Sequence, residues 1–222
     1  MSAPTLHLPQ PFGLPPHKAI YQDYPSLSLG KGDSLYRLGD EAESLFRVEE
    51  GLLKQGFDVI SGRERVISLV GPGDLVGAIS VTGSGYALNV TALSEGVRVT
   101  VIPADHVALD PGLKDDVFTA TTVHLRRAHD ALEDGELPTP ARLARAFLRL
   151  GARFGQTAGD GRVLLKLPLT HDTLAAMIGA ARETTTATLG EMRTLGVLAG
   201  TRGQYSFYPD ALSDFALERS LL

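Results

Sequence analysis

The sequence contains no cysteine among its 222 residues. This absence excludes disulfide bonds, thiolate catalysis, cysteine-ligated zinc and cysteine-ligated iron–sulfur clusters, and it favours an intracellular, cytoplasmic protein. No apolar run approaches the roughly 20 residues that a membrane-spanning helix needs, so we expect no association with a membrane. The first 16 residues contain five prolines and no lysine or arginine, which is not the pattern of a signal peptide.

The chain also lacks an overall basic charge, because its formal net charge is −5. The two parts of the chain differ, however. Residues 1–136 carry 11 basic and 19 acidic side chains, whereas residues 137–222 carry 10 basic and 7 acidic ones, and nine of those ten are arginines. A basic excess in an otherwise acidic chain indicates that the C-terminal part meets an anionic partner, although an excess of this size also arises by chance.

Short apolar runs separated by glycines occupy residues 27–102. Runs of this length between turn signals are typical of an antiparallel sandwich or barrel. Residues 61–64 are expected at a hairpin tip, and Pro103 is expected to end the last strand, because proline donates no hydrogen bond to a strand ladder. The proline-rich segment 1–25 is expected to be irregular.

A single helix is expected next, from residue 104 or 113 to residue 131. Phe118, Leu125 and Leu132 are seven residues apart along this stretch. The spacing is typical of a coiled-coil seam, and we expect a homodimer to form through it. Because only about two heptads are present, the pattern also fits an ordinary stripe that faces the core. Residues 134–138 are expected to break the helix and to form a hinge between domains.

Thr139 and Pro140 favour the start of another helix, with the threonine as its cap and the proline in its first turn. Its apolar face consists of side chains at helical spacing: Leu143, Phe147, Leu150 and Phe154. A glycine-rich loop follows at 155–161, and residues 163–167 are expected to form a strand.

The segment from residue 169 to residue 195 has the pattern of a helix-turn-helix. Thr170 is expected to cap the first helix, and Gly179 falls where the chain must turn sharply into a second helix at 181–195. The buried face of the first helix is expected to comprise Leu174, Ala175, Met177 and Ile178.

The exposed start of the second helix carries Arg182, Glu183 and Thr184. Arginine can donate to O6 and N7 of guanine, glutamate can accept from N4 of cytosine, and threonine can contact a phosphate or a thymine methyl group. A hairpin over residues 200–208 would place Arg202 against the DNA backbone. The alternative is a surface Arg–Glu pair on an ordinary helical hairpin.

This order of features resembles the catabolite-activator/FNR (CRP/FNR) superfamily of transcription regulators. The resemblance covers about residues 24–208. It rests on these segments: 32–40 (GDSLYRLGD), 42–46 (AESLF), 48–51 (VEEG), 73–77 (GDLVG), 169–170 (LT), 174–175 (LA), 178–179 (IG) and 182–184 (RET). It implies an α+β fold with three parts: a β-roll (jelly roll) of the cyclic-nucleotide-binding type over 1–112, a dimerisation helix and hinge over 113–136, and a winged helix-turn-helix over 137–222.

At the positions of the family's nucleotide pocket, this sequence carries other residues than the family does. In the family, a glutamate holds the ribose and an arginine–serine pair holds the cyclic phosphate. Here the corresponding positions are Ala78, after Gly77, and Tyr86-Ala87, before Leu88. A buried phosphate without its cation is strongly disfavoured, so we expect no dependence on cAMP. The pocket is then vestigial, filled by its own side chains, or open to an apolar ligand.

No other cofactor and no catalytic site is indicated. The iron–sulfur type of sensor in the family needs cysteines, and no metal-ligand spacing, catalytic constellation or phosphate-binding glycine loop is present. We therefore expect a protein that is not an enzyme and has no cofactor. The histidines that a haem sensor would need are scattered and are interpreted as ordinary residues: His17, His106, His124 and His129.

The second helix of the helix-turn-helix also departs from the family. Members that bind TGTGA half-sites carry a further arginine one turn after Arg-Glu-Thr, and here that position is Ala187. Ala181 stands where members of the family often carry a serine that contacts a phosphate. Thr185 and Thr188 stand at positions that are usually apolar in the family. Since a bidentate contact contributes about 1–3 kcal/mol of discrimination, we expect a related half-site whose second guanine is recognised less strictly.

The sequence thus predicts a homodimeric, sequence-specific DNA-binding regulator on a near-palindromic double-stranded site. We expect it to act as an activator, and repression by overlap of sites stays open as an alternative. Arg182 and Glu183 would specify bases, and the residues contacting the DNA backbone would be Thr170, Thr184, Thr186 and Arg202. The resemblance implies contact with RNA polymerase through residues 155–162. Two further alternatives stay open: a regulator gated by cAMP or another small ligand, with amides around 83–85 replacing the arginine, and a ligand-binding module that binds no DNA.

Overall fold

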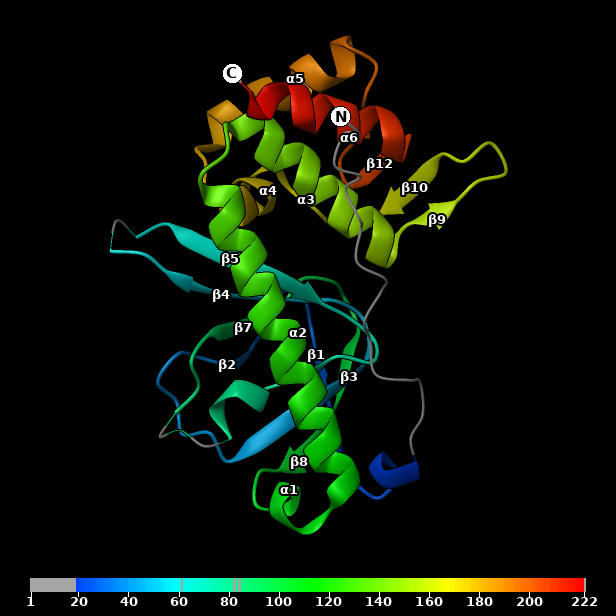
Figure 1. Ribbon diagram of the computed structural model, residues 1–222. Coiled ribbons are helices and arrows are strands. Elements are labelled where there is room, and N and C mark those ends of the chain that lie inside the picture. The colour runs from blue at the N-terminus through cyan, green and yellow to red at the C-terminus, as the bar shows by residue number, and fades with distance from the viewer. Residues whose placement is uncertain (1–18, 61, 82, 84, 222) are drawn as a thin grey trace, which may run out of the picture. The chain divides into compact units, whose positions relative to one another are not determined.

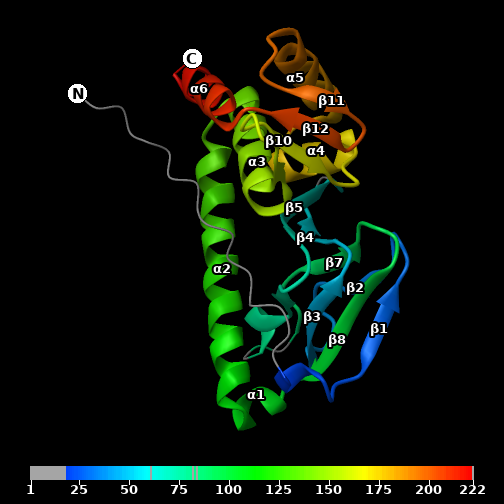
Figure 2. The same ribbon diagram turned by 90° about the vertical axis from the view of Figure 1, so that its right-hand side faces the viewer.

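The computed structural model describes residues 19–60, 62–81, 83 and 85–221 (Figures 1 and 2). The expectations for the segment 1–18, which includes His17, and for Ser61 at the predicted hairpin tip lie outside the described residues. The described chain forms two compact units, residues 19–129 and residues 130–221. No helix in this part of the chain combines the length and the apolarity that a bilayer crossing demands.

In the described part of the first unit, the strands pair into two four-stranded antiparallel sheets, with the orders β1-β8-β3-β6 and β2-β7-β4-β5. The strands are β1 (Ser26–Leu29), β2 (Ser34–Tyr36), β3 (Ser44–Glu50), β4 (Leu53–Asp58), β5 (Glu64–Val70), β6 (Leu75–Val76), β7 (Asn89–Ala92) and β8 (Val97–Pro103). Two short 3-10 helices accompany them, η1 (Ala19–Tyr21) and η2 (Ala78–Ser80). This is the predicted antiparallel roll, and its last strand ends at Pro103 as predicted.

Strand β3 is buried on both of its faces, because alternate side chains point to opposite sides of a sheet. Phe46 and Val48 belong to a core cluster that residues of both sheets share. Leu45 belongs to a second cluster on the other side, where Ile102 and Leu113 pack against it. The second cluster covers the sheet with the start of the long helix, so both faces of β3 are removed from water.

The long helix α2 (Pro111–Gly135) follows the short helix α1 (His106–Leu109). The predicted alternative start at residue 113 lies close to the observed start, whereas the start at residue 104 and the end near residue 131 were wrong. The segment from residue 104 contains a separate short helix, and α2 continues through Asp134 and Gly135 to end where residues 136–138 leave the helix. A glycine costs little in a last turn, where the chain is about to leave the helix anyway.

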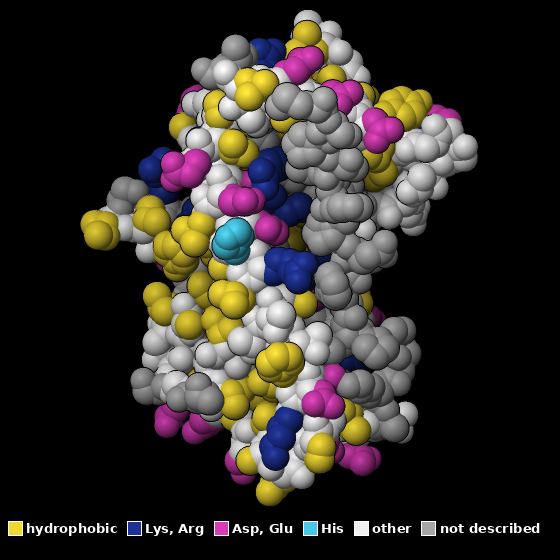
Figure 3. All heavy atoms as spheres, in the orientation of Figure 1, with side chains coloured by type: hydrophobic (Ala, Val, Ile, Leu, Met, Phe, Trp, Pro, Cys, Tyr) yellow, Lys and Arg dark blue, Asp and Glu magenta, His cyan; other side chains and the backbone are white. Residues whose placement is uncertain are grey.

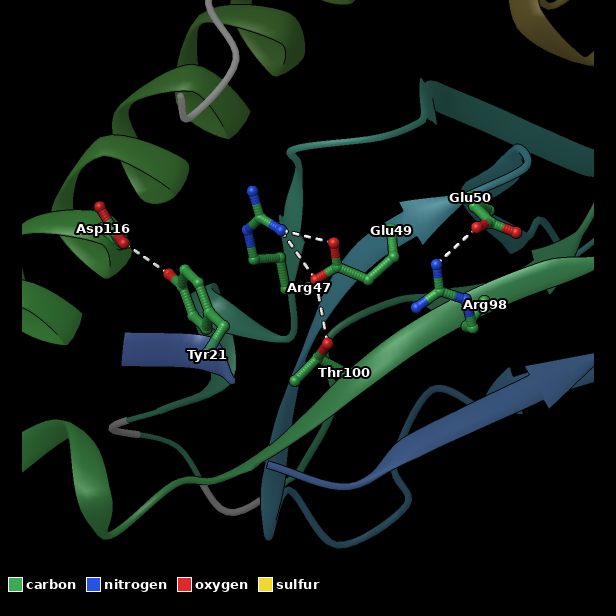
Figure 4. A network of polar contacts seen from close by, with 7 residues as sticks. All are labelled: Tyr21, Arg47, Glu49, Glu50, Arg98, Thr100 and Asp116. Atoms are coloured by element: carbon green, nitrogen blue, oxygen red, sulfur yellow. Dashed lines mark hydrogen bonds and ion pairs between the residues drawn. The ribbon is translucent and has the colours of Figure 1, made fainter. Parts of the chain in front are cut away.

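A network of polar side chains fixes the first turns of α2 to the roll (Figure 4). The hydroxyl of Tyr21 donates to the buried carboxylate of Asp116 at 2.5 Å, and the guanidinium of Arg47 lies 4.8 Å from the centre of the Tyr21 ring. Burial and the neighbouring Asp116 raise the pKa of Tyr21. Further along α2, Arg127 pairs with Asp74 at 3.3 Å. The helix is therefore held to the roll at two places.

The carboxylate of Glu49 forms the other part of the network in Figure 4. Arg47 donates from Nη1 to both of its oxygens at 2.7 Å, and Thr100 donates to Oε1 at 2.9 Å. Burial raises the pKa of Glu49, but these hydrogen bonds outweigh burial, so its pKa lies below the ordinary value. The negative charge of Glu49 thereby compensates the positive charge of Arg47, whose side chain is almost completely buried.

The second unit is a helical domain with a small sheet of order β11-β12-β10-β9 among its described residues. Its elements are α3 (Thr139–Phe154), β9 (Gln156–Thr157), β10 (Val163–Lys166), α4 (His171–Ile178), α5 (Arg182–Thr194), β11 (Ala199–Thr201), β12 (Gln204–Phe207) and α6 (Pro209–Ser220). Leu143 and Phe147 of α3 are completely buried, as their spacing predicted. The prediction of Thr139 as the cap was wrong: Pro138 is the N-cap, and Thr139 is the first helical residue.

Two arginines of α3 meet one buried carboxylate at the end of α2. Asp134 lies 2.8 Å from Nε of Arg145 and also pairs with Arg149. The neighbouring Glu133 pairs with Arg145 at 2.9 Å, but its side chain is half exposed. Asp134 is almost entirely removed from water, so the two arginines supply the polar partners that a buried carboxylate needs.

We expect Asp134→Ala to lower the free energy of unfolding of the second unit by about 1–3 kcal/mol, since it leaves two half-buried arginines without their shared carboxylate. Glu133→Ala is the matched control, and it should cost less than about 1 kcal/mol because an exposed pair is screened by water. Urea denaturation followed by far-ultraviolet circular dichroism measures both. Equal losses in the two variants would contradict this account.

Candidate nucleic-acid interface

The start of α4 is stabilised by the predicted cap. The hydroxyl oxygen of Thr170 accepts a hydrogen bond from the backbone N–H of Thr173 at 3.0 Å. This bond satisfies one of the free N–H groups at the start of a helix. Thr170 is itself exposed, so the capping residue also lies at the protein surface.

The turn between α4 and α5 is made by Gly179, as predicted. Its backbone is left-handed, with φ of 63°, and the N–H of Ala180 donates to the carbonyl of Ala175 at 3.0 Å. Glycine adopts this conformation without steric cost. Arg142 of α3 donates to the carbonyl of Ile178 at 2.9 Å and so holds the end of α4. The two helices of the motif are thereby connected in a defined geometry.

Helix α5 has one buried face and one exposed face. Leu189 and Met192 are buried, together with Thr185 and Thr188. The two threonines donate to the carbonyls of the residues four positions earlier, each at 2.9 Å. Buried hydroxyl groups need such partners, and this explains how threonine replaces the usual apolar residue.

The opposite face of α5 is exposed and carries the residues that the sequence selected. They are Arg182, Glu183, Thr184 and Thr186, followed by Ala187. Arg182 and Glu183 stand in the first turn, which in a helix-turn-helix is the part of the recognition helix that contacts base edges. The structure thus leaves both base-specifying candidates accessible.

Two contacts join this face to the first turn of α4. Nδ1 of His171 lies 2.8 Å from the hydroxyl of Thr186, and Oδ1 of Asp172 lies 3.5 Å from Nε of Arg182. The sequence reasoning missed both His171 and Asp172. The available signal was their position, directly after the cap of a helix that packs against the recognition helix.

The contact of His171 limits how Thr186 can meet DNA. A phosphate oxygen only accepts hydrogen bonds, so the threonine must donate to it. It can do so only while the histidine Nδ1 carries the hydrogen of their own contact. The role assigned to Thr186 therefore depends on its neighbour in α4.

The hairpin of β11 and β12 is the predicted wing. Arg202 lies at its tip, is exposed, and has a left-handed φ of 50°. Gly203 is required beside it, because a Cβ atom there would lie 2.1 Å from the carbonyl oxygen of Leu167. Nε of Arg193 in α5 donates to the carbonyl of Gly200 at 2.8 Å, which ties the wing to the recognition helix.

Aromatic side chains pack together around Tyr86, one of the residues that the sequence assigned to the candidate effector pocket of the roll. The rings of Tyr36 and Tyr86 stack with centroids 3.7 Å apart, and Phe46 packs beside both. The hydroxyl of Tyr86 donates to the carbonyl of Ser44 at 2.7 Å. Burial raises the pKa of both tyrosines above the ordinary value.

The other residues assigned to the pocket lie around these rings. Gly77 has a left-handed φ of 86°, and a Cβ atom there would lie 3.1 Å from the carbonyl oxygen of Ser44. Ala78 and Leu88 are buried, whereas Ala87 is exposed. Of the three states that the sequence left open for this pocket, these contacts favour the one in which side chains fill it.

Family models match both units. A model of the cyclic nucleotide-binding domain matches residues 26–108, and a model of the Crp-like helix-turn-helix domain matches residues 141–213. The transcriptional regulator LdrP of Thermus thermophilus is 31% identical to this chain over 169 residues, which is 75% of this chain and 84% of LdrP. The chain belongs to the CRP/FNR superfamily of transcription regulators. The predicted resemblance and fold class are thus confirmed, whereas the domain limits 1–112, 113–136 and 137–222 stay predictions.

Other members of the superfamily align over most of the chain. The CRP-like cAMP-activated global transcriptional regulator of Mycobacterium tuberculosis is 25% identical over 183 residues, 80% of this chain and 81% of that protein. The crystal structure of a CRP/FNR-family transcriptional regulator from Thermus thermophilus superposes with a TM-score of 0.72 at 26% identity. That match covers 88% of this chain and 100% of the other.

The stacked tyrosines lead to a prediction about stability. Tyr86→Ala should lower the free energy of unfolding of the roll by about 3–5 kcal/mol, because it removes a buried aromatic ring and leaves a cavity. Tyr86→Phe keeps the ring and loses only the hydrogen bond to Ser44, so it should cost about 1 kcal/mol. Urea denaturation followed by circular dichroism distinguishes the two. A small loss in Tyr86→Ala would show that the ring does not fill the interior.

Proposed function

We propose that this member of the superfamily is a homodimeric, sequence-specific DNA-binding regulator that activates transcription without cAMP. The observation that carries the proposal is the exposed Arg182-Glu183-Thr184 turn at the start of α5, within a Crp-like helix-turn-helix. Arg182 would contact a guanine, and Glu183 would accept from the paired cytosine. As a regulator of this kind it acts on DNA in the cytoplasm and catalyses no reaction.

The contacts to the DNA backbone follow from the same surface. Thr170 and Thr184 lie exposed in α4's cap and α5's first turn, and Arg202 lies at the tip of the wing. These groups would fix the position of the duplex while the first turn of α5 selects the sequence. Since Ala187 has no side chain that reaches a base edge, the second guanine of a TGTGA half-site would be recognised less strictly.

Independence from cAMP is supported by the aromatic interior of the roll. Tyr86, which the resemblance puts at the position of the family's phosphate-binding arginine, is stacked on Tyr36, and Ala78 would offer no carboxylate to a ribose. A ligand would have to displace Tyr86 and break its hydrogen bond to Ser44. The Mycobacterium tuberculosis relative bears the description cAMP-activated, so a cAMP-gated form with a rebuilt pocket is the second candidate.

Contact with RNA polymerase would use residues 155–162. Their turn is exposed, and hydrogen bonds hold it in shape. Ala158 donates to the carbonyl of Arg162 at 2.8 Å, Arg162 donates to the carboxylate of Asp160 at 3.0 Å, and Tyr208 donates to the same carboxylate at 3.1 Å. A surface turn of fixed shape is suited to a protein contact that needs no prior ordering.

Fluorescence anisotropy of a labelled duplex tests the function. The duplex carries a TGTGA-type palindrome, and a scrambled duplex of equal length is the control, both at one fixed salt concentration. We expect preferential binding to the palindrome that cAMP does not change and that Arg182→Ala abolishes. Binding only in the presence of cAMP would favour the rebuilt pocket. A protein that binds neither duplex at low salt would contradict DNA binding.

The homodimer leads to a separate prediction. Phe118, Leu125 and Leu132 of α2 are 74%, 69% and 74% exposed in the single chain, although all three are large and apolar. Figure 3 shows hydrophobic side chains on the outward face of α2. Seven-residue spacing places them on one side of the helix, where a second α2 would cover them.

Leu125→Glu should weaken the dimer at least roughly 100-fold, because each protomer loses a buried leucine and gains a charge in the seam. Leu109→Glu is the matched control, since Leu109 is equally exposed but lies on α1, outside the seam. Sedimentation equilibrium measures both dissociation constants. A dimer that tolerates Leu125→Glu as well as Leu109→Glu would place the interface elsewhere.

A further inference from the structure

The first turn of α4 presents a carboxylate to the principal base-contacting candidate of α5. Asp172 is the second residue of α4, and Arg182 is the first residue of α5. Oδ1 of Asp172 lies 3.5 Å from Nε of Arg182. Both side chains are largely exposed, 71% for Asp172 and 63% for Arg182, so the pair lies at the surface on which we place the DNA.

We propose that Asp172 is a specificity-determining residue that positions the guanidinium of Arg182 for contact with a guanine. The inference rests on the proposed DNA-binding function and deepens it. Asp172 touches no base in this account. It acts through Arg182, by holding the Nε side of the guanidinium and leaving a donor on each terminal nitrogen for the guanine.

The geometry of the guanidinium explains why the Nε side matters. The group is planar and carries five N–H donors in a fixed fork. When an acceptor lies on the Nε side, one donor from each terminal nitrogen remains for the two acceptors of guanine, O6 and N7. An arginine side chain also has many rotamers in water, and an ion pair that selects one of them reduces the ordering needed on binding.

Apart from its effect on Arg182, a negatively charged carboxylate is unfavourable on a surface that binds DNA. A negative charge close to phosphate groups lowers the affinity for every duplex, whatever its sequence. It therefore lowers binding to non-specific DNA, whereas at the correct site the orientation of Arg182 compensates for the repulsion. Both effects increase the ratio of specific to non-specific affinity, which is the quantity that sequence recognition depends on.

The simplest competing explanation is that Asp172 only stabilises α4. An acidic residue in a first turn interacts favourably with the helix dipole. However, Thr170 already caps this helix, and a second contact joins the same turn to α5, between His171 and Thr186. The first turn of α4 thus contacts α5 at Arg182 and again, one helical turn later, at Thr186. Two such contacts are what we expect of a turn that positions the recognition helix.

Selection from a library of duplexes with a randomised central segment tests the proposal on the full-length protein. Wild type, Asp172→Asn and Asp210→Asn are compared, and the selected duplex and a scrambled one are then titrated with each protein. Asp210 is the matched control, since it is also an exposed acidic residue at the second position of a helix, α6. Circular dichroism verifies that the variants are folded.

For wild type and Asp210→Asn we expect enrichment of sites with one fixed guanine in each half-site. For Asp172→Asn we expect that guanine to be enriched less, with the other positions unchanged. The ratio of the two dissociation constants should fall about tenfold, through tighter binding to the scrambled duplex and weaker binding to the selected one. In the background of Arg182→Lys, which lacks the fork, Asp172→Asn should change no base preference.

Two results would overturn the proposal. If Asp172→Asn changed the affinity for both duplexes by the same factor and left the base preferences intact, the carboxylate would act only through general charge or helix stability. If wild type itself enriched no sequence, the proposed function would fail and this inference with it. The two failures are distinguishable, because wild type still selects a site in the first case.

Discussion

The burial of one face of α5 decides which of its side chains can meet a ligand. Leu189 and Met192 pack inward with Thr185 and Thr188, and the helical period then leaves Arg182, Glu183 and Thr186 outside. The buried threonines bond to the backbone one turn earlier, so they leave no unsatisfied group in the interior. The exposed positions of α5 can therefore change while the packing of the domain is preserved.

In the roll, packing constrains the interior between the two sheets. A sandwich of two small sheets is stable only when its interior is filled, and in this chain Tyr36, Phe46 and Tyr86 supply that filling. The domain thus has the architecture of a cyclic nucleotide-binding domain with aromatic side chains packed in its interior.

Elements with strong local signals could be predicted from the sequence. Three predictions of this kind are confirmed: the turn at Gly179, the cap at Thr170 and the apolar spacing of α3. Each of these signals determines structure within a few residues of itself. The same reasoning gave Thr139 as a cap and ended α2 too early, because boundaries depend on small differences between neighbouring residues.

The contacts that connect elements distant in sequence could not be predicted in this way. The pairing of Asp172 with Arg182 and of Asp134 with the arginines of α3 depends on how helices pack, and no local pattern encodes it. The helix α6 and the strand β9 also went unpredicted. The stacking of Tyr36 on Tyr86 brings together the end of β2 and the segment before β7, which are neighbours only because β2 pairs with β7.

The charged anchors of α2 have a geometric consequence for its apolar seam. Asp116, Arg127 and Asp134 each stand two residues away from Phe118, Leu125 or Leu132. At 100° per residue such a separation is about 200°, so the anchors share one side of the helix and the seam occupies the other. One side of α2 thus contacts its own chain, and the other side presents exposed apolar side chains. The insertion of one residue between Phe118 and Leu125 would rotate the following residues by about 100° around the helix axis, and Phe118 would no longer share a side with Leu125 and Leu132.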